Sequence, residues 1–281
     1  MDEVTRGASG GARWEVATRR PQGSLAPHVR RLQGYDERTD GILRRRELPG
    51  PRVVAIVELG PPLKIHGREG AAPSRFRGGF VAGIDAASTL TEHDGWQRGV
   101  QIDLSPTSAR RLFGVSMHEL AHRVTPLEDL LRPEHRTLPE ALADAPTWTA
   151  RMDRAERWVA AEVSRGPRPD RRVAHAVACI DARGGDLDIG ALQRAVGVSR
   201  KHLVALFREH VGVPPKVYAR LVRLERLVER VRDGGEGWAS LAAELGFSDQ
   251  PHLAREVRAL TGMTPTALAS LLRATPDAFA G

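Results

Sequence analysis

The sequence predicts a two-domain α+β protein, in which a β-rich N-terminal domain precedes an all-α C-terminal domain. Strand-like segments occur between residues 52 and 105, and helical periodicity replaces them after Pro106. A pattern near the C-terminus is repeated further along the chain, which indicates a duplicated helical unit. A chain of 281 residues is long for one domain and comfortable for two.

The N-terminal half is expected to form a small sheet or half-barrel followed by helices. Residues 1–23 contain Gly, Ser and Arg without apolar periodicity and predict a loose tail. Residues 25–38 are compatible with a short helix or a strand. The segments 52–59 and 62–67 predict a strand pair joined through Gly60-Pro61-Pro62. Further strands are expected at 78–84 and 99–105, and helices at 107–114, 135–145 and 147–164.

A linker is expected at residues 164–170, where two prolines and a glycine occur without any apolar side chain. This boundary assigns residues 24–163 to an N-terminal domain and residues 171–281 to a C-terminal domain. A glycine pair, Gly184-Gly185, is expected to end the first helix of the C-terminal domain.

A helix-turn-helix unit is predicted around the sequence AVGVSRKHLVALFREHVGVPP. Gly197 breaks one helix, and Ser199 stands where an N-cap oxygen would accept from free amides of the next helix. The spacing of Leu203, Leu206 and Phe207 predicts one buried face. The opposite face carries Arg200, Lys201, Val204, Ala205 and Arg208, and a helix of this kind fits a major groove.

The same pattern occurs a second time in LAAELGFSDQPHLAREVRALTGMTP. The first three shared residues (Leu, Gly and Ser) repeat at an offset of 49 residues. The next four (Leu, then Phe in the first copy and Val in the second, then Gly and Pro) repeat at an offset of 50. One extra residue therefore lies between Ser248 and Leu253. The two units are expected at about 188–212 and 238–262, joined by a long helix from about Pro214 to Arg232.

This double pattern resembles the DNA-binding domain of the AraC/XylS family of bacterial transcription regulators. The resemblance covers roughly the last 110 residues, and the segment 112–131 resembles part of the N-terminal domain of one AraC-type subgroup. It implies a sequence-specific DNA-binding regulator whose two recognition helices enter successive major grooves. By alignment of the repeat, the outward face of the second unit carries Gln250, Pro251, Ala254, Arg255 and Arg258.

Several of the outward residues have an expected role in DNA binding. Gln250 suits adenine and Arg255 suits guanine, while Val204 and Ala205 suit thymine methyl groups. Arg208 and Arg258 are expected to contact phosphates, and Ser199 and Ser248 to cap helices first and bind phosphate second. Two positions depart from the family pattern: Val257 replaces a large aromatic residue and predicts a less filled second core, and Ala205 replaces a long polar side chain.

Charge and composition agree with a DNA partner. The net charge is +7, and the segment 188–232 has ten Lys or Arg against four acidic residues, so the first unit and the long helix are expected to attract phosphates. The single cysteine, Cys179, is expected to be a small buried apolar residue in a reducing compartment. Without a signal peptide or an apolar run of about 20 residues, the sequence predicts a cytoplasmic protein with no membrane contact.

The expected partners are an operator in double-stranded DNA, a small-molecule effector at the N-terminal domain, a second copy of the chain and, if the protein activates transcription, RNA polymerase. No cofactor and no metal is expected. The competing hypothesis is a zinc-dependent hydrolase, because HELAH matches the H-E-x-x-H pattern. On one helix His118 and His122 would share a face, with Glu119 as general base. A third hypothesis is a ligand-binding module without DNA binding.

Overall fold

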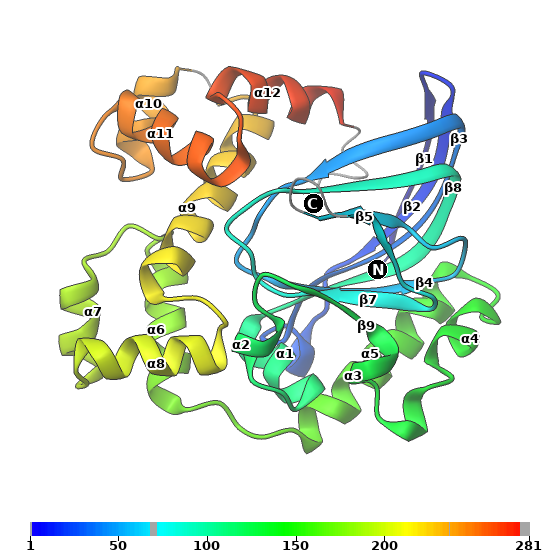
Figure 1. Ribbon diagram of the computed structural model, residues 1–281, viewed down its shortest axis with the longest axis horizontal. Helices are drawn as coiled ribbons and strands as arrows, with labels where there is room; N and C mark the ends of the chain where they lie inside the picture. The colour runs from blue at the N-terminus through cyan, green and yellow to red at the C-terminus, as the bar shows by residue number, and fades with distance from the viewer. Residues whose placement is uncertain (1, 68–71, 236, 276–281) are drawn as a thin grey trace.

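The computed structural model describes residues 2–67, 72–235 and 237–275 and divides them into a sheet domain and a helical domain (Figure 1). Within these residues nine strands form one antiparallel sheet, in the order β1-β2-β3-β8-β4-β7-β9, with β5 on β8 and β6 on β5. The strands are β1 (Glu3–Ser9), β2 (Ala12–Arg19), β3 (Val29–Glu47), β4 (Val53–Glu58), β5 (Lys64–His66), β6 (Ser74–Arg75), β7 (Gly79–Ala82), β8 (Thr89–Leu104) and β9 (Val124–Pro126).

The two faces of this sheet differ in chemistry. Leu32 pairs with Ile102, and Ile102 with Ala55, so that one face is apolar across three strands. On the opposite face Gln33 pairs with Gln101, and Glu37 with Gln97. Because side chains alternate along a strand, the same strands present an apolar face and a polar face, and both are largely buried.

Helices cover the apolar face. The sheet residues of this face share one core with Ala109 and Leu112 of α1 and with Met152 and Ala155 of α5. Gly34 admits the ring of Trp148, with which any larger side chain would collide. Figure 1 shows these helices below the sheet. The helices of this domain are α1 (Pro106–Phe113), α2 (Met117–Leu120), α3 (Leu127–Leu130), α4 (Leu138–Ala143) and α5 (Trp148–Arg165).

The predicted loose tail is wrong. Residues 3–19 form the hairpin β1–β2, whose second strand pairs with β3 over eight residues. Arg19 fixes the hairpin to α5, because its guanidinium lies 2.7 Å from Asp153 and 2.8 Å from Glu156. The segment 25–38 is strand rather than helix for most of its length, since β3 begins at Val29.

The predicted pairing of the segments 52–59 and 62–67 is also wrong. β4 and β5 do not pair with each other, and both pair with β8. The first half of β8 carries β5, with Ile65 opposite Thr91, and its second half carries β4, with Ile56 opposite Gln101. The two segments therefore lie one after the other along the same edge of β8 instead of forming the expected hairpin.

The helical domain contains the two predicted helix-turn-helix units, α7–α8 and α10–α11, joined by the long helix α9. Residues 166–170 connect α5 to α6, while residues 164 and 165 still belong to α5. The end of the expected C-terminal domain, residues 276–281, lies outside the described residues. The helices are α6 (Arg171–Ala182), α7 (Ile189–Val196), α8 (Arg200–His210), α9 (Pro215–Arg232), α10 (Trp238–Glu244), α11 (Gln250–Thr261) and α12 (Pro265–Ala274).

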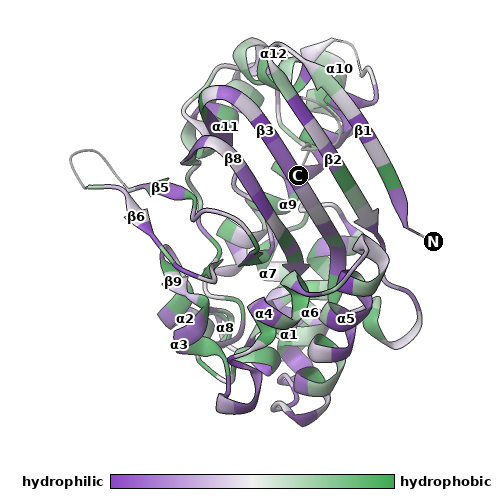
Figure 2. Ribbon diagram, turned by 90° about the vertical axis from the view of Figure 1, so that its right-hand side faces the viewer, coloured by the Kyte–Doolittle hydropathy of each residue, from purple (hydrophilic) through white to green (hydrophobic). Residues whose placement is uncertain are grey.

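The helical domain lies beside the sheet domain (Figure 1). Figures 1 and 2 both show α12 toward the upper end of the molecule and α1 and α5 toward its lower end. The first unit contacts the N-terminal domain through α8, where Arg110 donates to Glu209 at 2.9 Å and Ser116 donates to Glu209 at 2.8 Å. The second unit contacts it through Ser88, which donates to the carbonyl of Thr261 at 3.2 Å.

Candidate nucleic-acid interface and effector cavity

The first helix-turn-helix unit has the geometry that its sequence predicts. Gly197 adopts a left-handed conformation with φ of 70°, which ends α7. The Ser199 hydroxyl accepts from the amide of His202 at 3.2 Å and caps α8. Leu203 and Phe207 are fully buried. Of the side chains between them, Leu206 packs half-buried against the same core and Ala205 is exposed on the outward face.

The second unit has the same shape but a different cap. Gly246 ends the first helix with φ of 72°. Asp249, not Ser248, caps α11 by accepting from the amide of His252 at 2.6 Å. The predicted capping role of Ser248 is therefore wrong. Asp249 is the extra residue of the second turn, and it takes the position that Ser199 has in the first.

Different aromatic residues fill the two units. Phe207 of α8 lies edge-on to Tyr218 of α9, with ring centroids 6.3 Å apart. In the second unit Val257 is buried at the corresponding position, and the aromatic ring comes from Phe247 in the turn. The Phe247 ring lies 5.6 Å from that of His252 and 5.1 Å from the guanidinium of Arg223. No sequence pattern indicated that Phe247 would supply this ring.

Figure 1 shows the two recognition helices at opposite ends of α9, with α8 at its lower end and α11 near its upper end. Val204 and Ala254 are half-buried, and the other side chains predicted to contact DNA are exposed. The exposed set is Ser199, Arg200, Lys201, Ala205, Arg208, Ser248, Gln250, Pro251, Arg255 and Arg258.

The arginines of α9 bind within the protein. Arg220 contacts Glu256 of α11 at 2.5 Å, and Arg230 contacts Glu244 of α10 at 2.7 Å. Arg223 donates to the carbonyl of Gly185 at 2.9 Å. The expectation that this helix attracts phosphates therefore does not hold for these three arginines, which instead attach α9 to its neighbours.

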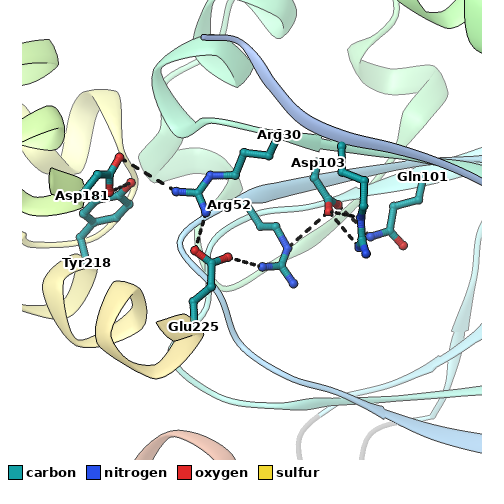
Figure 3. A network of polar contacts seen from close by, with 8 residues as sticks. Arg30, Arg52, Gln101, Asp103, Asp181, Tyr218 and Glu225 are labelled. Atoms are coloured by element: carbon teal, nitrogen blue, oxygen red, sulfur yellow. Dashed lines mark hydrogen bonds and ion pairs between the residues drawn. The ribbon is translucent and has the colours of Figure 1, made fainter. Parts of the chain in front are cut away.

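A polar network joins α9 to the sheet domain (Figure 3). Glu225 of α9 accepts from Arg30 at 2.5 Å and from Arg52 at 2.7 Å. Asp181 of α6 accepts from the Tyr218 hydroxyl at 3.0 Å. Burial raises the pKa of Asp181, while Arg30 and Tyr218 act in the opposite direction. Nothing in the sequence indicates this network, because Arg30 and Glu225 are 195 residues apart.

A cavity of about 170 Å³ lies against the polar face of the sheet. One wall is apolar and comes from β4, β5, β7 and β9; its side chains include Val54, Ile56, Leu63, Ile65, Phe80 and Val124. The other wall is polar and comes from β3 and β8; its side chains include Gln33, Tyr35, Gln97 and Gln101. Arg52 lines the cavity and also binds Glu225, so it belongs to both the cavity and the network between the domains.

The HELAH segment does not form the helix that a zinc peptidase requires. α2 ends at Leu120, and His122 has φ of 60°, so His118 and His122 do not share a helical face. His122 lies 2.8 Å from Asp85 instead. Across the described residues, metal-ligand spacing is found at Glu134, His135 and Glu162.

That acidic group already has cationic partners. Arg132 lies 2.6 Å from the Glu162 carboxylate, and Arg165 lies 3.3 Å from it. Two guanidinium groups therefore occupy the place in which a cation would bind.

Among the described residues, no helix has both the length and the apolar composition of a membrane span.

Comparisons with known proteins agree with this geometry. Residues 192–270 match a family model described as a helix-turn-helix domain. Among solved structures, ToxT from Vibrio cholerae O395 bound to (E)-4-(8-methylnaphthalen-1-yl)but-3-enoic acid is 9% identical, with a TM-score of 0.50 over 83% of this chain and 100% of that chain. The AraC-like transcriptional activator CuxR is 16% identical, with a TM-score of 0.32 over 82% of this chain and 86% of that one.

No curated protein matches the sequence. The family match covers both helix-turn-helix units, and the ToxT likeness extends the shared fold to the sheet domain. Residues 192–270 therefore form a helix-turn-helix domain, and the chain has the two-domain fold of ToxT, with an N-terminal antiparallel sheet domain and a C-terminal helix-turn-helix region.

Proposed function

We propose that the protein binds double-stranded operator DNA in a sequence-specific manner and inserts α8 and α11 into two successive major grooves. The observation that carries this proposal is that both helices have exposed outward residues and lie at opposite ends of α9, which joins them (Figure 1). α9 has 18 residues and is about 27 Å long at ~1.5 Å per residue. Equivalent groove positions are about 34–36 Å apart along one side of the duplex, so α9 has the length of a suitable spacer.

Within this proposal the outward residues divide into two groups. Gln250 and Arg255 pair with bases, because an amide suits adenine and a guanidinium suits guanine. Val204 and Ala205 contact thymine methyl groups, and Arg200 and Lys201 enter the groove with them. Phosphate contacts come from Arg208 and Arg258, with Ser199 and Ser248 beside them, and Pro251 and Ala254 complete the apolar contact of the second helix.

Selection of bound fragments from a random DNA pool tests the proposal. The full chain should enrich one motif with two half-sites about one helical turn apart, and binding should weaken steeply as salt increases. The double variant Arg200→Ala, Lys201→Ala should lose the half-site contacted by α8. Arg136→Ala is the matched control, because Arg136 is an exposed arginine of the other domain. Failure to enrich any motif, or affinity that does not change with salt, would contradict DNA recognition and favour a ligand-binding module.

We further propose that a small-molecule effector binds in the cavity of the sheet domain. The support is a cavity with one apolar and one polar wall in the domain whose fold resembles that of the ligand-bound ToxT. Arg52 offers a physical connection to DNA binding, since it lines the cavity and holds Glu225 on α9. A ligand that moves Arg52 changes how α9, and with it both recognition helices, is attached to the sheet.

Amide hydrogen exchange tests this connection. Glu225→Gln removes the charge that both Arg30 and Arg52 bind, so exchange of α9 amides in the full chain should become faster. Lys216→Gln is the control, because Lys216 is exposed on the same helix and carries a charge outside the network. Equal exchange in the two variants would show that the network does not hold α9.

The remaining partners follow from the regulatory role. We propose that the protein acts in the cytoplasm, because bacterial operator DNA lies there. The protein partners that we propose for an activator are a second copy of the chain and RNA polymerase. The hydrolase hypothesis receives no support from the geometry of His118, Glu119 and His122.

A further inference from the structure

We infer that the cavity takes a compound that donates hydrogen bonds, such as an alcohol, and discriminates against carboxylates. The inference rests on the proposed effector site and names the ligand class of that site. It follows from the way in which two buried carboxylates orient two glutamine amides of the polar wall, Gln97 and Gln101.

The first pair is Gln97 and Glu37. The Gln97 side-chain nitrogen donates to the Glu37 carboxylate, and both residues are buried. Burial alone would raise the pKa of Glu37, but contacts with His93 and Arg45 lower it to about 2. Glu37 is therefore ionised near neutral pH and can only accept hydrogen bonds. The NH₂ group of Gln97 must face Glu37, which leaves its carbonyl oxygen as the end that can serve a ligand.

The second pair repeats this arrangement four residues along β8. The Gln101 side-chain nitrogen donates to Asp103 at 2.7 Å. Asp103 is buried and lies 3.0 Å from Arg31 and 3.7 Å from Arg52, so cationic groups surround its carboxylate. Figure 3 shows the Gln101 nitrogen turned toward Asp103 and its oxygen turned away. Both glutamines line the cavity, and both are held as hydrogen-bond acceptors.

The cationic groups that line the cavity are already paired within the protein. Among the lining residues, Arg45 binds Glu37 at 2.9 Å and Arg52 binds Glu225 at 2.7 Å, while the Glu47 carboxylate accepts from the Thr91 hydroxyl at 3.0 Å and Asp85 lies 2.8 Å from His122. An anionic ligand would have to break one of the two arginine pairs or enter without a counter-ion, and burial of an unpaired charge is costly. A carboxylate would also face the amide oxygens. An alcohol donates to such an oxygen without any of these penalties.

The size and shape of the cavity define the ligand further. A cavity of about 170 Å³ is close to the ~150 Å³ of an engineered cavity that binds benzene, so one ring fits. The two glutamines are four residues apart, roughly 13 Å along the strand. A longer ligand with a donor near each end would reach both. Its carbon skeleton would lie against the apolar wall formed by Ile56, Ile65 and Phe80.

A panel of cyclohexane derivatives tests the ligand class with the full chain. Cyclohexanol and trans-1,4-cyclohexanediol donate hydrogen bonds, cyclohexanone only accepts them, and cyclohexanecarboxylate is an anion. Calorimetry or ligand-detected NMR should rank the alcohols above the ketone by about two- to tenfold, the value of one hydrogen bond, and the carboxylate last. Preference for the ketone or the carboxylate would overturn the assignment but leave the cavity as an effector site. Binding of none of the four would overturn both proposals.

Two substitutions locate the effect. Gln97→Met and Gln101→Met keep the length of the side chain and remove the acceptor, so each should weaken alcohol binding by about two- to tenfold and leave ketone binding unchanged. Gln22→Met is the control, because Gln22 is exposed and outside the cavity. Ketone binding reports whether each variant keeps its fold. Unchanged alcohol binding in both variants would overturn the proposal.

Discussion

The two helix-turn-helix units have one shape but are attached to the rest of the molecule in different ways. The first unit packs directly on the sheet domain, where Glu209 binds Arg110 and Ser116. The second unit is held mainly by α9, through the contacts of Arg220 with Glu256 and of Arg230 with Glu244. A change in the sheet domain therefore reaches the first unit directly, and reaches the second largely through the long helix.

The largest expected difference concerns the two cores. Phe207→Ala should reduce the free energy of unfolding by ~3–5 kcal/mol, because Phe207 is fully buried against Tyr218. Val257→Ala at the equivalent position removes a smaller side chain and should cost about 2 kcal/mol. Urea unfolding measures both. Equal losses would show that the second core is as tightly filled as the first.

The second-largest expected difference between the two units concerns their contacts with DNA. Arg255→Ala should weaken operator binding by ~1–3 kcal/mol and binding to random DNA much less, because we propose a base contact. Arg208→Ala should weaken binding to all sequences alike and reduce the salt dependence by about one charge. Titrations on operator and random duplexes at several salt concentrations measure both effects. Equal losses on the two duplexes for Arg255→Ala would exclude it from base recognition.

The helix caps provide a smaller contrast. Ser199→Ala and Asp249→Ala should each reduce the free energy of unfolding by about 1 kcal/mol, because each side chain accepts from a free amide of its helix. Ser248→Ala should change it by less than about 0.5 kcal/mol, since Ser248 does not cap α11. Thermal unfolding compares the three variants. A large loss in Ser248→Ala would restore Ser248 as the cap.

The smallest expected difference between the two units is a loss of folding stability at acid pH in the first unit. Burial and the charge of Arg110 lower the pKa of His210. The nearby carboxylates of Glu209 and Asp170 act in the opposite direction but do not reverse this shift. The unfolded chain takes up a proton as the pH falls through 6.5, and the folded chain does so only at lower pH, so stability decreases below pH 6.5. The second unit has buried Leu260 at the equivalent position. His210→Leu should remove part of this loss, as melting temperatures at pH 7.5 and 5.5 would show. An equal drop in both proteins would contradict the assignment.

The C-terminal domain could be predicted because its signals are local. Turn glycines, the spacing of Leu203 and Phe207, and the inserted residue before Leu253 lie within one repeat, and the structure confirms all three. The capping error at Ser248 arose because serine and aspartate are both good N-caps and stand side by side.

The sheet domain was harder to predict because its strands do not show a simple alternation of apolar and polar residues. β1 is mostly exposed, so its seven residues have no apolar period. Much of the polar face of β3 and β8 is buried, so Gln33, Glu37 and Gln97 resemble surface residues in the sequence. The network at Glu225 joins residues far apart in the chain, which no local pattern encodes. The cavity that we propose as the effector site was therefore expected only in general terms.

The hairpin at the very start of the chain has a practical consequence. A shortened protein that begins at residue 24 would lack both strands of the hairpin and leave the long edge of β3 uncovered. Uncovered strand edges pair readily with other molecules, so such a version should aggregate during purification. Affinity tags and truncations are better placed where they leave Glu3–Arg19 intact.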